Sequence, residues 1–204
     1  LKNVELLCLK VLNSDLRGKA VSLIEALEWC INNNVNIVNC SLGTTSKSDF
    51  SALEAVFNKI KNQKIIIVAA KSNKNIYTYP ACNNNVIGVK SNYIYKDGNI
   101  KLKWYPFDDV EVETSGVHTL VLKDNGSFKT INANSFSTPV VTARIADIID
   151  KYGQMTVIEI LKHLEGEAVT VMGKYLFPES PYPWGQNKKI VEKECYEQII
   201  EKYI

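Results

Sequence analysis

The sequence predicts an α/β fold with a mainly parallel central sheet, helices on both faces of that sheet and a β-hairpin at its periphery. Two observations favour this class. Over the first 90 residues, short apolar runs alternate with amphipathic segments in the order strand, helix, strand, helix, strand, strand. The apolar runs are almost unbroken, which is typical of parallel strands that are buried on both faces.

The elements of this first half follow in order. Residues 4–12 (Val-Glu-Leu-Leu-Cys-Leu-Lys-Val-Leu) predict a strand buried on both faces. Ser22 and Glu25 have the spacing of a capping box and predict the start of the first helix, and Ser51 and Glu54 predict the start of the second in the same way. Further buried strands are predicted at residues 35–40, 64–70 and 86–89.

The second half has a different pattern. Residues 93–104 alternate around Asp97-Gly98 and predict the hairpin. Pro139 and Gly153 mark the two ends of a helix of about four turns. Short strands are predicted at residues 110–112, 119–122 and 127–131, further helices at 156–164 and 190–204, and a proline-rich connection at 176–185.

Composition and charge exclude several classes of function. The chain has 204 residues, 46% of them hydrophobic, and we expect one globular domain over residues 1–204. The net charge of +2 is spread without a basic stripe, so neither nucleic acid nor an anionic membrane is an expected partner. No apolar run approaches the roughly 20 residues of a membrane span, and no signal peptide is visible.

The metal-binding and redox-active residue types are sparse. The two histidines, His118 and His163, lack paired ligand spacing, so we expect no zinc site. No glycine-rich phosphate loop follows any predicted strand, which disfavours a nucleotide-binding domain, and no cofactor is predicted. An odd number of scattered cysteines favours a reducing compartment, with the cytoplasm slightly favoured: Cys8, Cys30, Cys40, Cys82 and Cys195.

Ser135 lies in a small-residue loop, residues 131–139, that leads directly into the predicted helix. Its hydroxyl is therefore expected near the positive end of a helix dipole, where developing negative charge is stabilised. An acyl-transfer enzyme places its nucleophile in such a position. The alternative is that Ser135, Ser137 or Thr138 only caps the helix, since serine and threonine are preferred caps.

Five segments in a fixed order connect this serine to a known family. The segments are residues 37–43 (Ile-Val-Asn-Cys-Ser-Leu-Gly), 67–73 (Ile-Val-Ala-Ala-Lys-Ser-Asn), 79–81 before 86–89, 114–117 (Thr-Ser-Gly-Val) and 134–139 (Asn-Ser-Phe-Ser-Thr-Pro). Together they resemble the subtilisin-like serine proteases (subtilases, peptidase S8 type).

The resemblance implies a three-layer subtilisin-like fold, of which this chain holds the C-terminal two-thirds. Residues 1–150 match the family pattern, and residues 165–204 form an unmatched extension. The matched positions imply that Ser135 is the nucleophile and that Asn73 stabilises the oxyanion. They also imply that Ser41, Leu42 and Gly43 pair with an extended peptide substrate. Calcium is common in the family, but no acidic cluster here matches a site, so no metal ligand is predicted.

The family's catalytic aspartate and histidine precede the nucleophile in the order Asp, His, Ser, and neither motif occurs in this sequence. His118 and His163 fall outside the family's triad positions, and we do not expect either to act as the base. Ala133 and Val140 also depart from the family's usual glycine and histidine. Two interpretations remain open: a serine endopeptidase completed by an N-terminal segment outside this chain, and a non-catalytic peptide-binding pseudoprotease.

Overall fold

The structure is a computed structural model, and it describes residues 4–61, 63–74, 76–92, 100–104, 110–115, 119–122, 125–131 and 133–172. Its centre is a six-stranded sheet in the order β1-β2-β3-β5-β4-β8. Strands β1, β2, β3 and β5 are parallel, whereas β4 is antiparallel to β5 and parallel to β8. The strands are β1 Ile37–Cys40, β2 Ile66–Ala70, β3 Val86–Ser91, β4 Ile100–Trp104, β5 Val110–Thr114 and β8 Thr170–Met172.

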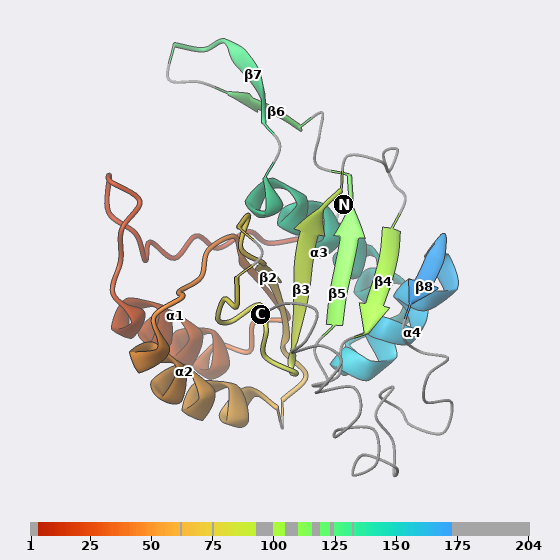
Figure 1. Ribbon diagram of the computed structural model, residues 1–204. Helices are drawn as coiled ribbons and strands as arrows, with labels where there is room; N and C mark the ends of the chain where they lie inside the picture. Colours follow the sequence, from red (N-terminus) through yellow and green to blue (C-terminus); the bar gives the residue numbers. More distant parts are fainter. Residues whose placement is uncertain are drawn as a thin grey trace, which may run out of the picture.

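Helices cover both faces of this sheet (Figure 1). Helices α1 (Ala20–Asn32) and α2 (Lys47–Ile60) contribute Leu27, Leu53 and Phe57 to a core on the face that carries Ile67 and Ala69 of β2. On the opposite face, α3 (Asn134–Tyr152) and α4 (Val157–Glu167) pack against the alternate residues of the same strands. The predicted three layers are therefore present.

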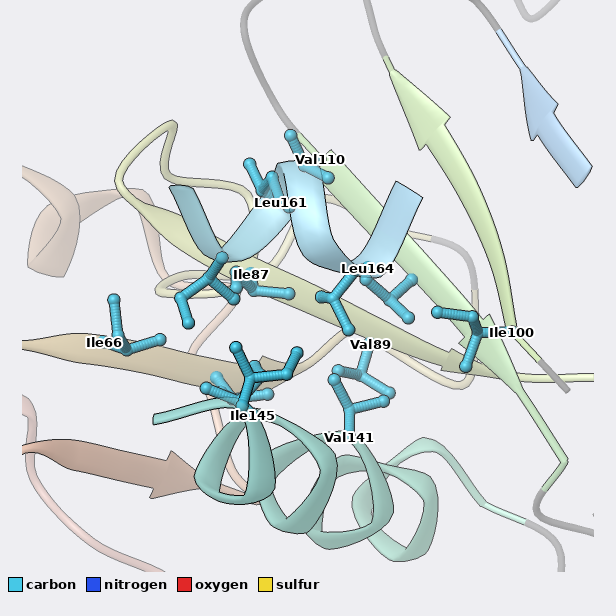
Figure 2. Close-up of a cluster of buried hydrophobic side chains, with 13 residues drawn as sticks. Ile66, Ile87, Val89, Ile100, Val110, Val141, Ile145, Leu161 and Leu164 are labelled. Atoms are coloured by element: carbon cyan, nitrogen blue, oxygen red, sulfur yellow. The ribbon is translucent and has the colours of Figure 1, made fainter. Parts of the chain in front are cut away.

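Figure 2 shows the α3 and α4 side of the core. The sheet contributes Ile66, Ile87, Val89, Ile100 and Val110, while α3 contributes Val141 and Ile145 and α4 contributes Leu161 and Leu164. All of these side chains are buried. This packing anchors the middle of α3, so the N-terminal turn of α3 is held at the carboxyl ends of β1, β2 and β3.

Residues 4–12 correct the sequence prediction, because the structure places no strand there. The side chains of this segment are mostly exposed, with 84% of Leu6 and 53% of Leu7 accessible to solvent. Strand β1 is the edge of the sheet, and no described residue pairs with its outer side. An apolar run can become a buried strand only where neighbours accept its backbone hydrogen bonds, and residues 4–12 have no such neighbour among the described residues.

Only the second half of the hairpin predicted for residues 93–104 can be compared with the structure. β4 is indeed a strand, but β5 and β8 occupy its two edges, and residues 93–99 lie outside the described residues. The peripheral hairpin is instead formed by β6 (Thr119–Leu122) and β7 (Phe128–Ile131), which stand apart from the main sheet (Figure 1). The predicted segments at 176–185 and 190–204 also lie outside the described residues.

Two helix starts, those of α1 and α2, differ from prediction, although the helices themselves are confirmed. Ser22 and Ser51 lie inside α1 and α2, which begin at Ala20 and Lys47, and neither N-cap has a side-chain hydrogen bond. Thr156 does form a capping box with Glu159 at the start of α4. Ser-x-x-Glu is compatible with a helix interior as well as a helix start, so the pattern alone does not locate the first residue.

Candidate active site

The N-terminal turn of α3 lies against the loops that follow β1 and β2. We call this region the corner, and it contains the site residues expected from the sequence: Ser41, Leu42, Gly43, Asn73 and Ser135. The Ser41 hydroxyl donates to the backbone carbonyl of Ser135 at 2.9 Å. The Asn73 side-chain oxygen accepts from the backbone N–H of Asn134, also at 2.9 Å. Segments that are 94 and 61 residues apart in the chain are thus joined by direct hydrogen bonds.

Ser135 is the second residue of α3, not a residue that precedes the helix, because α3 begins at Asn134 with Ala133 as its N-cap. The N-cap is Ala133, which makes no side-chain hydrogen bond, so the interpretation of Ser135, Ser137 or Thr138 as the cap is wrong. The predicted end at Gly153 is confirmed, and Gly153 has the positive φ of 86° that glycine adopts without strain.

Pro139 explains why Ser41 is bonded to Ser135. In a regular α-helix the carbonyl of residue 135 would accept the N–H of residue 139, but proline has no N–H to donate. The Ser41 hydroxyl supplies the missing donor. The sequence places Ser41 at the cleft edge, and the structure adds this contact with the backbone of the candidate nucleophile.

Two hydrogen-bond donors at this corner have no acceptor among the described residues. One is the Asn73 side-chain Nδ2, because the only described hydrogen bond of the Asn73 amide uses its oxygen. The other is the backbone N–H of Ser135, which lies in the first turn of α3, where the helix itself provides no acceptor. Two such donors next to a serine form an arrangement that can stabilise an oxyanion.

The Ser135 hydroxyl is half-buried and has no hydrogen-bond partner in the part of the chain that the structure describes. His118 lies outside that part. His163 lies on α4 and stacks on Tyr152 with 4.6 Å between the ring centroids. Tyr152 is the last residue of α3, about 25 Å along the helix axis from Ser135. His163 is therefore too distant to serve as a base for this serine.

Leu42 and Gly43 form the edge of the corner. Leu42 packs against the core on the α1 and α2 side. A Cβ at Gly43 would lie 2.7 Å from the carbonyl oxygen of Tyr79, so only glycine allows this close approach of the two backbones. Directly after it, Thr44 and Tyr79 exchange two backbone hydrogen bonds of 2.7 and 2.9 Å.

Sequence reasoning missed two residues that support Ser41. Thr142 on α3 donates to the Asn39 side-chain oxygen at 2.9 Å, and the Asn39 side-chain nitrogen donates to the Ser41 hydroxyl at 3.0 Å. A polar chain thus runs from the third turn of α3 across β1 to Ser41. The signal in the sequence is Asn39 itself, a polar residue within an otherwise apolar strand.

Sequence reasoning also missed a buried ion pair, which joins the residue directly after β2 to a residue of β5. The ammonium of Lys71 lies 3.5 Å from the carboxylate of Glu111, and both side chains are largely buried. Gly88 makes room for it, because a Cβ there would lie 2.6 Å from Cε of Lys71. The alternation of Glu111 and Glu113 with valines in β5 indicates a polar face, but the sequence does not identify the strand that supplies the lysine.

The described residues contain no group of three or more His, Cys, Asp or Glu side chains that could hold a metal ion. None of the helices in the same part of the chain is both long and apolar enough to cross a membrane.

Comparison with known proteins gives a consistent result. The model of the Subtilase family matches residues 1–185. Subtilisin BL of Lederbergia lenta is 26% identical over 178 residues, which cover 86% of this chain and 64% of the relative. The thermostable alkaline protease of Halalkalibacterium halodurans is 28% identical over 173 residues, which cover 84% and 46% of the two chains.

Solved structures agree at the level of the fold. Sphericase superposes with a TM-score of 0.57 at 20% identity, over 76% of this chain and 57% of its own. S41 psychrophilic protease superposes with a TM-score of 0.59 at 19% identity, over 79% and 61% of the two chains. The present chain spans less than two thirds of the length of each of these four proteins.

Proposed function

Because the chain belongs to the subtilase family, whose model matches residues 1–185, we propose that it is the larger part of a serine endopeptidase domain. Ser135 is the nucleophile that attacks the scissile carbonyl. The Asn73 Nδ2 and the Ser135 backbone N–H stabilise the resulting oxyanion. The observation that carries the proposal is that these two donors have no acceptor among the described residues and flank the same serine.

The physical argument concerns where negative charge can develop. The first turn of α3 presents the Ser135 N–H, which has no acceptor among the described residues, and the positive end of the helix dipole, and both favour an anion over a neutral carbonyl. A carboxamide held by its oxygen can direct its nitrogen at the same point. Preorganised donors of this kind stabilise the tetrahedral intermediate more than the substrate, and therefore accelerate acyl transfer.

We assign the substrate edge to Ser41, Leu42 and Gly43. These residues continue β1 past its last paired position, and Gly43 and Thr44 run beside Tyr79. An extended peptide can add to such an edge through backbone hydrogen bonds, with its scissile bond directed toward Ser135. Ser41 has a second role in this proposal, because its hydroxyl holds the Ser135 carbonyl.

The aspartate and histidine of the triad lie outside this chain in our proposal and belong to an N-terminal segment. Three observations support a partner of this kind. The Ser135 hydroxyl has no partner among the described residues, the outer edge of β1 is open, and the apolar residues 4–12 are exposed. Exposed contiguous apolar surface commonly marks an interface. Without the base, we expect this chain alone to be nearly inactive.

The test is to compare the 204-residue chain alone with the same chain co-expressed with an N-terminal subtilase segment that carries aspartate and histidine. We expect peptide hydrolysis, and labelling of Ser135 by a fluorophosphonate, only in the complemented sample. Ser135→Ala should abolish both signals. Asn73→Ala should lower kcat by the ~10²–10³-fold seen when subtilisin loses its oxyanion amide. Failure of the complemented sample to label or hydrolyse would contradict the proposal.

The lack of a histidine near Ser135 in the described residues also favours a second candidate, a pseudoprotease that binds an extended peptide without cleaving it. This protein would bind the peptide with the same affinity before and after Ser135→Ala. It would remain inactive in the complemented sample. Calorimetry of peptide binding, run on the sample used for the activity assay, distinguishes the two functions.

A further inference from the structure

Asn134, the residue before the candidate nucleophile, uses every polar atom that it has. Its Nδ2 donates to the carbonyl of Lys71 at 2.8 Å, and its Oδ1 accepts the N–H of Ser91 at 2.8 Å. Its backbone N–H donates to Oδ1 of Asn73 at 2.9 Å, and its carbonyl accepts the Thr138 hydroxyl at 2.8 Å. The residue is only 4% exposed.

These bonds hold the first residues of the loop that follows β2. Lys71 is bound through its carbonyl and Asn73 through its side chain, and both bind the same residue. Between them, the Ser72 hydroxyl accepts the N–H of Lys74 at 3.1 Å, which fixes the turn. The Asn134 side chain thus holds Lys71 and Ser91, and with its backbone fixed in this way the Asn134 N–H holds Asn73 next to Ser135.

The hydrogen bonds also determine which way the Asn73 amide faces. An N–H group can bond only to the oxygen of a carboxamide, so the Asn134 N–H holds Oδ1 of Asn73 inward. The Nδ2 of Asn73 then points away from Asn134 and remains available as a donor. The bond to Ser91 at the end of β3 adds a third anchor on the sheet.

We propose that Asn134 is a positioning residue that orients the oxyanion donor Asn73 and sets its distance from Ser135. The inference rests on the proposed protease function. Asparagine suits this position because it offers one donor and one acceptor on a single methylene. Aspartate keeps the volume and the acceptor for Ser91 but loses the donor to Lys71, and alanine loses both side-chain bonds.

The test is a double-mutant cycle on the complemented enzyme, with kcat expressed per fluorophosphonate-labelled site so that only folded sites count. Asn134→Ala should lower kcat by ~10–100-fold, as expected for a misplaced catalytic group, and change KM by less than about threefold. In an Asn73→Ala background, the same substitution should change kcat by less than about twofold, because Asn134 acts through Asn73.

Two further variants complete the design. Asn134→Ser, whose hydroxyl can keep one of the two side-chain hydrogen bonds without adding a charge, should give a smaller loss of kcat than Asn134→Ala and serves if the alanine variant does not fold. Asn83 is a matched control: it is 3% exposed and bonds Glu54 and Tyr79 through its side chain, away from Ser135. Asn83→Ala should reduce stability and leave kcat unchanged.

The outcomes separate the two proposals. An inactive wild-type complemented enzyme overturns the proposed function. An active enzyme in which Asn73→Ala lowers kcat, but in which Asn134→Ala has no effect or an additive effect on kcat, overturns the positioning role of Asn134 alone.

Discussion

Residues 4–12 and strand β2 are both apolar runs, but in the structure β2 is buried and residues 4–12 are mostly exposed. Ile66, Ile67, Val68 and Ala69 of β2 are fully buried between β1 and β3, with a helical layer on each face. Residues 4–12 are mostly exposed and form no strand. The difference shows that an apolar run needs a backbone partner as well as a low polarity to become part of a sheet.

The same comparison bears on the proposed function. β1 has a strand on one side only, and residues 4–12 precede the helix α1 that leads into it. An N-terminal segment that docks at this edge would cover apolar surface and could bring a base toward Ser135.

The largest effect on stability is expected when an aspartate replaces an apolar residue in β2, compared with the same replacement in residues 4–12. Ile67→Asp buries an unpaired carboxylate and should lower the free energy of unfolding by about 3–5 kcal/mol. Leu6→Asp places the same charge in solvent and should change it by less than about 0.5 kcal/mol. Urea unfolding of the full chain, followed by circular dichroism, measures both. Equal losses would show that residues 4–12 are buried in solution.

Two cysteines test the same difference in burial, and this test introduces no charge. Cys8 lies in the exposed segment, while Cys40 at the end of β1 is buried, and burial raises the pKa of its thiol to about 12. A thiol reagent at pH 8 should label Cys8 at least ~100-fold faster than Cys40, since the reactive species is an accessible thiolate. Mass spectrometry of the labelled peptides gives the two rates, with Cys8→Ser as the control for assignment.

The raised pKa of Cys40 also predicts a pH dependence of stability. Above the usual thiol pKa near 8.5, the unfolded chain loses this proton while the folded chain keeps it, so stability falls as the pH rises. The slope from this one group approaches about 1.4 kcal/mol per pH unit between its unfolded and folded pKa values. Cys40→Ala should remove that part of the slope. An unchanged slope in urea titrations from pH 8 to 10.5 would contradict the assignment.

The smallest effect on stability concerns a polar side chain that is buried between α3 and the sheet. The Ser137 hydroxyl on α3 is fully buried and has no hydrogen-bond partner among the described residues. Ser137→Ala should therefore raise the free energy of unfolding by about 1–2 kcal/mol. Ser51→Ala, on the exposed face of α2, should gain only the helix-propensity difference of about 0.5 kcal/mol. A loss of stability in Ser137→Ala would indicate an acceptor for this hydroxyl.

Much of the site could be predicted because its residues lie at the ends of strongly patterned elements. Ser41 follows the apolar run of β1, Asn73 follows that of β2, and parallel strands bring such ends to one edge of the sheet. The end of α3 was equally predictable, since Gly153 requires no partner to adopt its backbone conformation. These features depend on local sequence and on strand direction.

The contacts that hold the site together could not be predicted in this way. Asn134 looks like any polar residue beside a serine, and its three partners outside α3 come from β3 and from the loop between β2 and β3. Lys71 forms an ion pair with Glu111, which lies two strands away, across the space that Gly88 leaves because it has no Cβ. Each of these pairings requires the register of the sheet, which no single segment contains.

The sequence by itself determined the strand and helix order of the parallel sheet, the family motifs and the serine at the start of α3, because periodicity and chain order are local properties. Only the tertiary structure decided that residues 4–12 stay exposed, that the Ser41 hydroxyl replaces the donor missing at Pro139, and that Asn134 fixes the Asn73 amide. These outcomes depend on which backbone and side-chain groups are within hydrogen-bonding distance once the sheet has formed, and such distances are set by packing between segments far apart in the chain.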